Sequence, residues 1–260
     1  MPDATGTALL ELNRVSKSFG RVVVADELSF TVAAGDVLGI VGPNGAGKTS
    51  LFGLISGDLA PTSGEIRFDG HPVTRLDAAA RCRRGIGRTY QVPRPFGDMT
   101  VFENVLVAAQ QGARLRRQAS YQRAAAVLDR TGLAREANTA SERLGLLQRK
   151  RLEVARALAT GPRLILLDEV AGGLTDPEVA QLVDIVRGIR NEGIAVVWIE
   201  HVMRALTAAV DRMICLAAGS FVADGRPAEV LADPAVREVF LGSEVTTSLA
   251  APGPDGAGGG

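Results

Sequence analysis

A glycine-rich loop between two apolar segments constrains this 260-residue chain more than any other feature. The run Val37–Val41 has the composition of a strand buried on both faces, and it leads directly into Gly-Pro-Asn-Gly-Ala-Gly-Lys-Thr at residues 42–49. The apolar segment Ser50–Ile55 that follows is typical of a helix. Successive glycines let backbone N–H groups point into one concavity, and a helix N-terminus adds positive potential there. The pattern therefore predicts a strand–loop–helix unit that binds phosphate groups.

Two side chains of this loop carry specific chemistry. Lys48 is placed to reach the outer phosphates of a nucleotide, and the Thr49 hydroxyl is placed to ligate Mg²⁺. The chain has only three lysines, so a lysine inside such a loop is informative. A chance glycine-rich turn is disfavoured because the required strand and helix flank the loop. We therefore expect the phosphates to be held by Gly42, Asn44, Gly45, Ala46, Gly47, Lys48, Thr49 and Ser50.

A second apolar run, Leu164–Leu167, ends in the acidic pair Asp168 and Glu169. A buried strand that ends in two acids places them at the carboxyl edge of the sheet, where open α/β sheets bind ligands. We expect Asp168 to hold Mg²⁺, directly or through water, and Glu169 to orient and deprotonate the attacking water. Acids at a strand end are common in themselves. Only in combination with the phosphate loop do they predict phosphoryl chemistry.

His201 follows a third apolar run, Ala195–Ile199, after Glu200. A lone histidine is usually structural, and this chain has two. A third strand that ends beside the nucleotide would nevertheless place an imidazole near the outer phosphate and the water. We therefore expect His201 to belong to the catalytic site. His71 lies in a polar turn with Pro72, and we expect no functional role for it.

The remaining pattern predicts an α/β fold with a helical insertion. Continuous apolar runs are typical of central strands, and shorter runs near turns favour an antiparallel sheet. Ala, Leu and Arg recur at helical spacing through the middle of the chain, at about residues 92–160. Residues 245–260 have few bulky side chains, and we expect them to be disordered. The central runs are Val37–Val41, Leu164–Leu167 and Ala195–Ile199, the antiparallel ones Leu9–Val15, Glu27–Val32 and Gly64–Phe68, and the helical stretches Val101–Ala109, Tyr121–Thr131 and Lys150–Ala159.

Charge and hydropathy exclude other classes of protein. The 29 basic and 29 acidic residues cancel, which disfavours a nucleic-acid binder, and we expect the three arginines of Arg81–Arg84 to form a solvated face. Cys82 and Cys215 lack metal-ligand spacing, so we expect buried or half-buried thiols in a reducing compartment. The apolar runs are strand-length, and Met1–Thr7 does not resemble a signal peptide. Work at a membrane would therefore require an embedded partner.

The order of these motifs resembles the nucleotide-binding domain of ABC transporters. The phosphate loop, Gln91, the helical insertion, Leu144–Gln148, the acidic pair and His201 follow one another as in that family, over about residues 8–244. The resemblance implies a P-loop NTPase (RecA-like) core at about 8–91 and 161–244, with an antiparallel β-subdomain and an α-helical subdomain inserted at about 92–160. It also implies the cofactors ATP and Mg²⁺.

The resemblance assigns four further residues. Phe19, in Ser-Phe-Gly, corresponds to the aromatic residue that stacks on adenine; a core phenylalanine before a turn is the alternative. Gln91 corresponds to the glutamine that touches Mg²⁺ or the water and relays the nucleotide state to the membrane subunits. Gly145 and Gln148 belong to the signature segment, which contacts the ATP of a partner subunit.

Within the family, several stretches resemble the G-type ATPase subunit of branched-chain amino-acid importers. This resemblance implies a second ABC ATPase as partner, identical or different, two transmembrane permease subunits and an extracytoplasmic solute-binding protein. It also implies a peripheral position on the cytoplasmic face of the cell membrane, with ATP hydrolysis coupled to transport. The stretches are Gly87–Gln91, Pro95–Val101, Glu103–Val107, Ile199–Met203 and Phe240–Gly242.

The sequence departs from the family in three places. The signature Leu-Ser-Gly-Gly-Gln is Leu-Gly-Leu-Leu-Gln at Leu144–Gln148, Val170 replaces a proline, and Thr175 replaces an aspartate. The altered signature leaves open a regulatory module that binds ATP with little turnover, although Glu169 and His201 are present. A soluble ABC ATPase of DNA repair or translation is the other alternative. Such proteins usually have two ATPase domains or large insertions and a basic surface, and this chain has neither.

Overall fold

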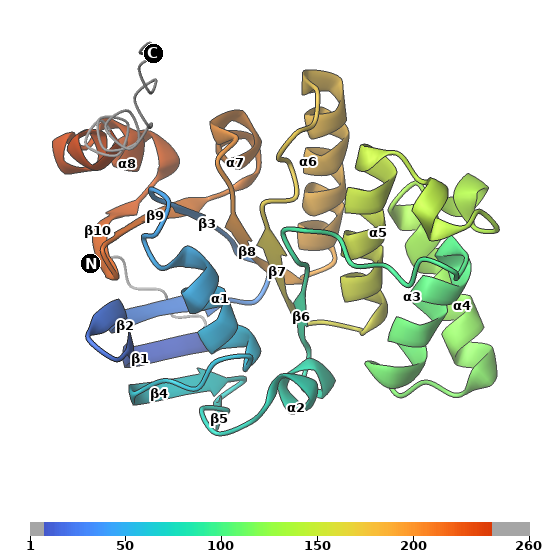
Figure 1. Cartoon of the computed structure of the whole chain (residues 1–260), viewed down its shortest axis with the longest axis horizontal. Coiled ribbons are helices and arrows are strands. Elements are labelled where there is room, and N and C mark those ends of the chain that lie inside the picture. The colour runs from blue at the N-terminus through green and yellow to red at the C-terminus, as the bar shows by residue number, and fades with distance from the viewer. Residues whose placement is uncertain (1–7, 241–260) are drawn as a thin grey trace, which may run out of the picture.

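The computed structural model of the chain describes residues 8–240, which form two β-sheets and a group of helices at one side (Figure 1). The predicted fold class, an α/β core with an antiparallel sheet and inserted helices, is confirmed. The elements are β1 (Ala8–Phe19), β2 (Val22–Ala33), β3 (Val37–Val41), α1 (Lys48–Ser56), β4 (Ser63–Phe68), β5 (His71–Pro72), α2 (Ala78–Arg83), β6 (Ile86–Arg88), α3 (Val101–Gln111), α4 (Arg117–Arg130), α5 (Leu146–Ala159), β7 (Leu164–Asp168), α6 (Asp176–Asn191), β8 (Ala195–Ile199), α7 (Met203–Ala209), β9 (Arg212–Ala217), β10 (Ser220–Gly225) and α8 (Pro227–Ala232), with short 3₁₀ turns at Ala134–Glu136 and Ser141–Arg143.

The central sheet has the strand order β10-β9-β3-β8-β7-β6, and every pairing from β9 to β6 is parallel. Its strands are apolar throughout because both faces are covered. Along β7, Leu164 and Leu166 join the core on the side of α1, whereas Ile165 and Leu167 join the core on the side of α5 and α6. Parallel strands end at one edge of a sheet, so the residues that follow β3, β7 and β8 are brought together.

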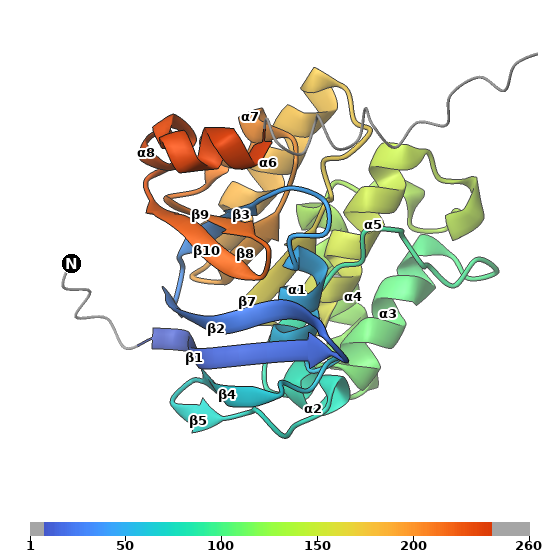
Figure 2. The ribbon, with the colours of Figure 1, turned by 60° about the vertical axis from the view of Figure 1, so that its left-hand side comes forward.

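The second sheet is antiparallel, with the order β2-β1-β4-β5. It packs with α1 and one face of the central sheet around a shared core that contains Leu10, Phe52 and Ile66 (Figure 2). The helix that follows the phosphate loop is therefore held between two sheets. This packing fixes the helix N-terminus relative to the strand ends.

Helices α3, α4 and α5 lie beside the parallel sheet (Figure 1). Thr100 and Glu103 form a capping box that starts α3. Buried Asn104 then fixes the preceding loop, since its side-chain amide donates to the carbonyls of Phe96 and Thr100 at 3.1 and 3.0 Å and accepts from the Phe96 N–H at 2.8 Å. The exact subdomain boundaries at residues 92 and 160 stay a prediction, and the predicted disordered tail at 245–260 lies outside the described residues.

One surface prediction is wrong. Arg81 is almost fully buried, and its guanidinium donates to the carbonyls of Leu54 and Ile55, at the end of α1, and of Leu76 and Thr74. Burial lowers its pKa to about 10. The arginine thus satisfies carbonyls that a helix C-terminus leaves without partners. Within residues 8–240, no helix combines the length and apolar character needed to cross a bilayer.

Candidate active site

The phosphate loop runs from β3 to α1 and depends on glycine at two positions. Gly42 and Gly47 have φ angles of 151° and 103°, in the region that favours glycine. A Cβ atom would collide with the Leu216 carbonyl oxygen at the first position and with the Val24 carbonyl oxygen at the second. The loop therefore packs directly against the backbone at Leu216 and at Val24, and this packing sets its conformation.

Lys48 is buried at the start of α1. Its ammonium group donates to the carbonyl oxygens of Gly42 and Pro43 at 2.7 and 2.9 Å, so the side chain folds back over its own loop. Burial lowers its pKa, and the carboxylates of Glu169 and Asp168 oppose this effect. The Lys48 ammonium group thus lies over the loop that is expected to bind the phosphates.

Asp168, the last residue of β7, is also buried. Burial raises its pKa, and the nearby Arg88 guanidinium opposes this effect. Asp168, Thr49 and Gln91 line one hollow of about 390 Å³, which we call the Asp168 hollow. Carboxylate, hydroxyl and amide oxygens are the donors that Mg²⁺ prefers, so this set fits the predicted metal. These three residues would hold Mg²⁺, which would neutralise phosphate charge when bound.

Glu169 follows with its backbone in the left-handed region, at φ 49°, which is uncommon outside glycine. Its side chain lies between two polar groups. His201 Nε2 lies 2.7 Å from one carboxylate oxygen, and Gln91 Nε2 donates to the other at 2.5 Å. His201 and Gln91, both expected near the attacking water, therefore contact Glu169 directly.

Two buried charged residues behind Glu169 were not predicted. Lys150 of α5 donates to the Glu169 carbonyl oxygen at 2.8 Å, and Glu200 accepts from the N–H groups of Ala171 and His201 at 2.5 and 2.9 Å. Burial lowers the pKa of Lys150 and raises that of Glu200. The scarcity of lysine was a signal for Lys150, but the sequence does not show that its target is a backbone carbonyl.

Phe19 and the signature residues lie on other parts of the structure, at the end of β1 and the start of α5. Phe19 ends β1 and is 50% exposed, with the Lys17 ammonium 4.9 Å from its ring centre, so it is not a core residue. Gly145 is the N-cap of α5 and has no side chain that could cap the helix. Leu146 is 48% exposed, whereas Leu147 is buried in the helical core. Of the two leucines in the altered signature, only Leu146 therefore adds an exposed side chain.

Thr175, the third departure from the family pattern, has a local structural role. Its N–H and its hydroxyl both donate to the Glu178 carboxylate, at 2.8 and 2.7 Å, at the start of α6. Val170, the second departure, is buried in the core. Both residues thus contribute to the local fold.

The fold and the clustered site together define a class, the phosphate-loop ATPases with an inserted helical group. Residues 25–172 match the family model described as ABC transporter, which is more than half of the chain. The chain belongs to the ABC transporter family, as one of its ATPases. Residues 222–246 match a second model, described as branched-chain amino acid ATP-binding cassette transporter.

Individual relatives point in two directions. The chain is 33% identical over 249 residues to the high-affinity branched-chain amino acid transport ATP-binding protein BraF of Pseudomonas aeruginosa, covering 90% of this chain and 98% of that protein. It is 35% identical over 236 residues to the lipopolysaccharide export system ATP-binding protein LptB of Acidithiobacillus ferridurans, covering 91% and 98%. A solved ATP-binding cassette of an ABC transporter in its ADP conformation is 28% identical, with a TM-score of 0.82 and coverage of 91% and 99%.

Proposed function

We propose that this ATPase energises an importer of branched-chain amino acids or related small solutes. The observation that carries the proposal is the match of residues 222–246 to the branched-chain amino acid transporter model, because that segment lies outside the general ATPase match. The similarity to BraF and the stretches Gly87–Gln91 and Ile199–Met203 support it. The substrate itself would be bound by other subunits.

The catalytic part of the proposal assigns a role to each clustered group. The loop N–H groups and Lys48 bind the phosphates of ATP, while Thr49, Gln91 and Asp168 hold Mg²⁺. Glu169 accepts a proton from the attacking water, and His201 orients the Glu169 carboxylate through its hydrogen bond. The contacts of Glu169 support these assignments, because hydrogen bonds to both oxygens fix the orientation of the carboxylate.

We further propose that a second ATPase completes the site. Exposed Gly145 is the N-cap of α5, and half-buried Gln148 lies in the first turn of that helix. A head-to-tail pair would bring this helix N-terminus to the partner's ATP, with favourable electrostatics for a phosphate.

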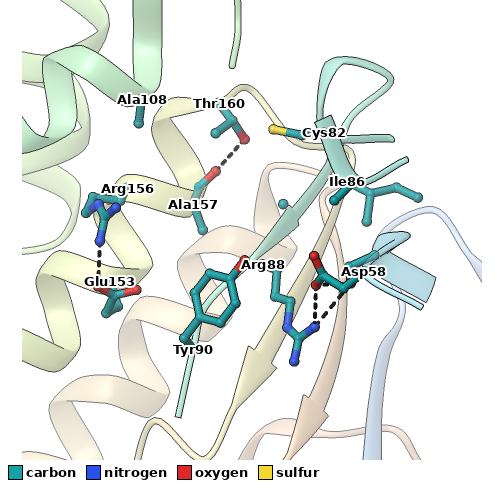
Figure 3. Close-up of a pocket in the computed structure, with 13 residues that line it drawn as sticks. Asp58, Cys82, Ile86, Arg88, Tyr90, Ala108, Glu153, Arg156, Ala157 and Thr160 are labelled. Carbon is teal, nitrogen blue, oxygen red and sulfur yellow. Dashed lines mark hydrogen bonds and ion pairs between the residues drawn. The ribbon is translucent and has the colours of Figure 1, made fainter. Parts of the chain in front are cut away.

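The proposed contact with a permease lies around Tyr90. A hollow of about 190 Å³, here the Tyr90 hollow, adjoins the Asp168 hollow and shares Asp58, Arg88 and Tyr90 with it (Figure 3). Large apolar side chains are exposed along the adjacent segment, at Val92, Phe96 and Met99. An exposed apolar segment beside a hollow is typical of a protein interaction site. Because Gln91 directly precedes this exposed segment, a cytoplasmic segment of a permease docked there would respond to the nucleotide, at the cytoplasmic face of the membrane.

Lipopolysaccharide export is the second candidate, because LptB proteins are as similar to this chain as BraF is. Deletion of the gene from the native host separates the two. Import predicts that uptake of radiolabelled leucine, isoleucine and valine falls and is restored by the wild-type chain but not by Glu169→Gln. Unchanged uptake of all three amino acids, together with loss of lipopolysaccharide from the cell surface, would contradict the import function and support lipopolysaccharide export.

A further inference from the structure

Arg88 connects the Asp168 hollow to the Tyr90 hollow. One terminal nitrogen of its guanidinium donates to Asp58 Oδ2 at 2.7 Å and to the Ser56 hydroxyl at 3.1 Å. The other terminal nitrogen donates to Asp168 Oδ2 at 3.3 Å. A single cation thus bridges Asp168 at the predicted metal site and Asp58 on the wall of the Tyr90 hollow. Figure 3 shows the Asp58 side of this bridge.

The surroundings of Arg88 make this bridge sensitive to charge. Its side chain is 10% exposed, and its guanidinium lies 5.8 Å from the ring centre of Phe52 and 5.2 Å from that of Tyr90. Among the described residues, its buried Nε has no hydrogen-bond partner. Charges interact more strongly where water is scarce, so a change at Asp168 is transmitted to Arg88 with little screening.

We propose that Arg88 is a positioning residue shared between Asp168 and Asp58, and that Mg²⁺ at Asp168 shifts its guanidinium toward Asp58. A divalent cation on Asp168 would repel the guanidinium and occupy the carboxylate that now accepts from it. Asp58 and Ser56 hold the shorter bonds, so they would retain Arg88. The wall of the Tyr90 hollow would then carry a different charge distribution with and without the metal.

This inference deepens the proposed function and rests on it for Mg²⁺ at Asp168 and for the molecule that occupies the Tyr90 hollow. If Arg88 is shared, the two carboxylates compete for it, and the metal competes with Arg88 for Asp168. By linkage, whatever strengthens the bond to Asp58 favours the metal, and whatever weakens that bond disfavours it.

The test measures how strongly Mg²⁺ enhances nucleotide binding by the purified full chain. The dissociation constant of AMP-PNP is determined with EDTA and with saturating Mg²⁺. The constant with EDTA is divided by the constant with Mg²⁺, and this ratio is compared between variants. Arg88→Met removes the competing cation and should raise the ratio at least about threefold. Asp58→Asn releases Arg88 to Asp168 and should lower the ratio at least about threefold. Arg67→Met, which removes an ion pair on the antiparallel sheet, is the control and should leave the ratio unchanged.

Opposite shifts in the two variants support the sharing of Arg88, because a merely structural role would lower the melting temperature in both without separating their ratios. Equal ratios in both variants and the wild type, or shifts in the same direction, overturn it. Arg88→Lys, which keeps the charge, should stay closer to the wild type than Arg88→Met. A wild-type chain that binds no AMP-PNP under either condition would instead contradict the proposed ATP site, so the two failures are distinguishable.

Discussion

His201 Nε2 lies 2.7 Å from Oε1 of Glu169, and this contact joins the ends of two neighbouring strands of the central sheet. The Glu169 N–H donates to the Ile199 carbonyl at 2.9 Å, which extends the pairing of β7 and β8 by one step. The imidazole and the carboxylate are therefore placed by sheet register. The contact holds the Glu169 carboxylate in one orientation while both side chains stay at the ends of their strands.

We predict that His201→Ala slows ATP hydrolysis about tenfold to a hundredfold, the effect of losing one hydrogen bond to a charged group. ATP affinity should change little, because the imidazole contacts Glu169 and not the phosphate loop. Single-turnover hydrolysis and equilibrium ATP binding measure the two quantities. His71→Ala is the control, since the other histidine is exposed on β5. Equal rates for both variants would remove His201 from the catalytic group.

Phe19→Ala should weaken ATP binding by about 1–3 kcal/mol if the ring stacks on adenine. Phe19→Trp should restore the affinity, and Tyr121→Ala, at an exposed aromatic residue on α4, should leave it unchanged. Calorimetric titration with ATP measures the effect. Unchanged affinity together with a lower melting temperature would instead assign Phe19 a packing role at the β1–β2 turn.

Lys150→Met should lower kcat more than it raises KM for ATP. The ammonium holds the Glu169 carbonyl at 2.8 Å, and the Glu169 backbone is in a conformation that needs such support. Steady-state kinetics in the complete transporter measure the split. Lys150→Arg should recover part of kcat, and Arg149→Met, on the exposed side of α5, is the control. A fall in stability with an unchanged kcat would show that Lys150 serves folding alone.

The elements that position the site could be predicted because they depend on local pattern. The predicted bounds of β3 and β8 match the structure, since a strand covered on both faces is apolar from end to end. Helices were harder at their first turn. For example, α4 begins at Arg117 and not at Tyr121, because its first turn, Arg117–Ser120, contains no large apolar side chain.

Contacts to backbone atoms could not be predicted. Lys150 and Glu200 support the Glu169 segment through carbonyl and N–H groups that every residue carries, so no side-chain motif reveals them. The error at Arg81 has the same cause, because its targets are the carbonyls that end α1. Arg88 was noted only as part of a family stretch, and its two carboxylate partners lie 30 and 80 residues away along the chain.

The altered signature predicts two unequal ATP sites in a pair with a different ATPase. Gly145 offers no hydroxyl to a phosphate, and a hydrogen bond to a charged group contributes about 1.5–3 kcal/mol. Exposed Leu146 adds a bulky side chain at the same surface. The N-terminus of α5 still attracts a phosphate, but this interaction contributes only about 0.3–1 kcal/mol. The site that uses the partner's phosphate loop should therefore be the weaker one.

Disabling the catalytic glutamate of one subunit at a time in the complete transporter measures this inequality. Glu169→Gln should remove the larger share of the ATPase activity. Gly145→Ser should strengthen the weaker site, because it restores a hydroxyl that can donate to the phosphate. The serine can be accommodated, since its Cβ would meet only the flexible end of the Gln148 side chain. Equal losses from the two glutamate variants, or a greater loss from the partner's variant, would contradict the proposed inequality.

Single-turnover hydrolysis by Glu169→Gln, with Lys48→Ala measured beside it, tests most directly whether this cluster is the catalytic site. The carboxamide keeps the shape of Glu169 but cannot accept the proton of water, whereas the role proposed for Lys48 is to bind the phosphates. In a complex whose partner ATPase is also disabled, Glu169→Gln should bind ATP as tightly as the wild type and hydrolyse none of it within many wild-type turnover times. Lys48→Ala should lose ATP binding. Hydrolysis at the wild-type rate by Glu169→Gln would show that another group activates the water.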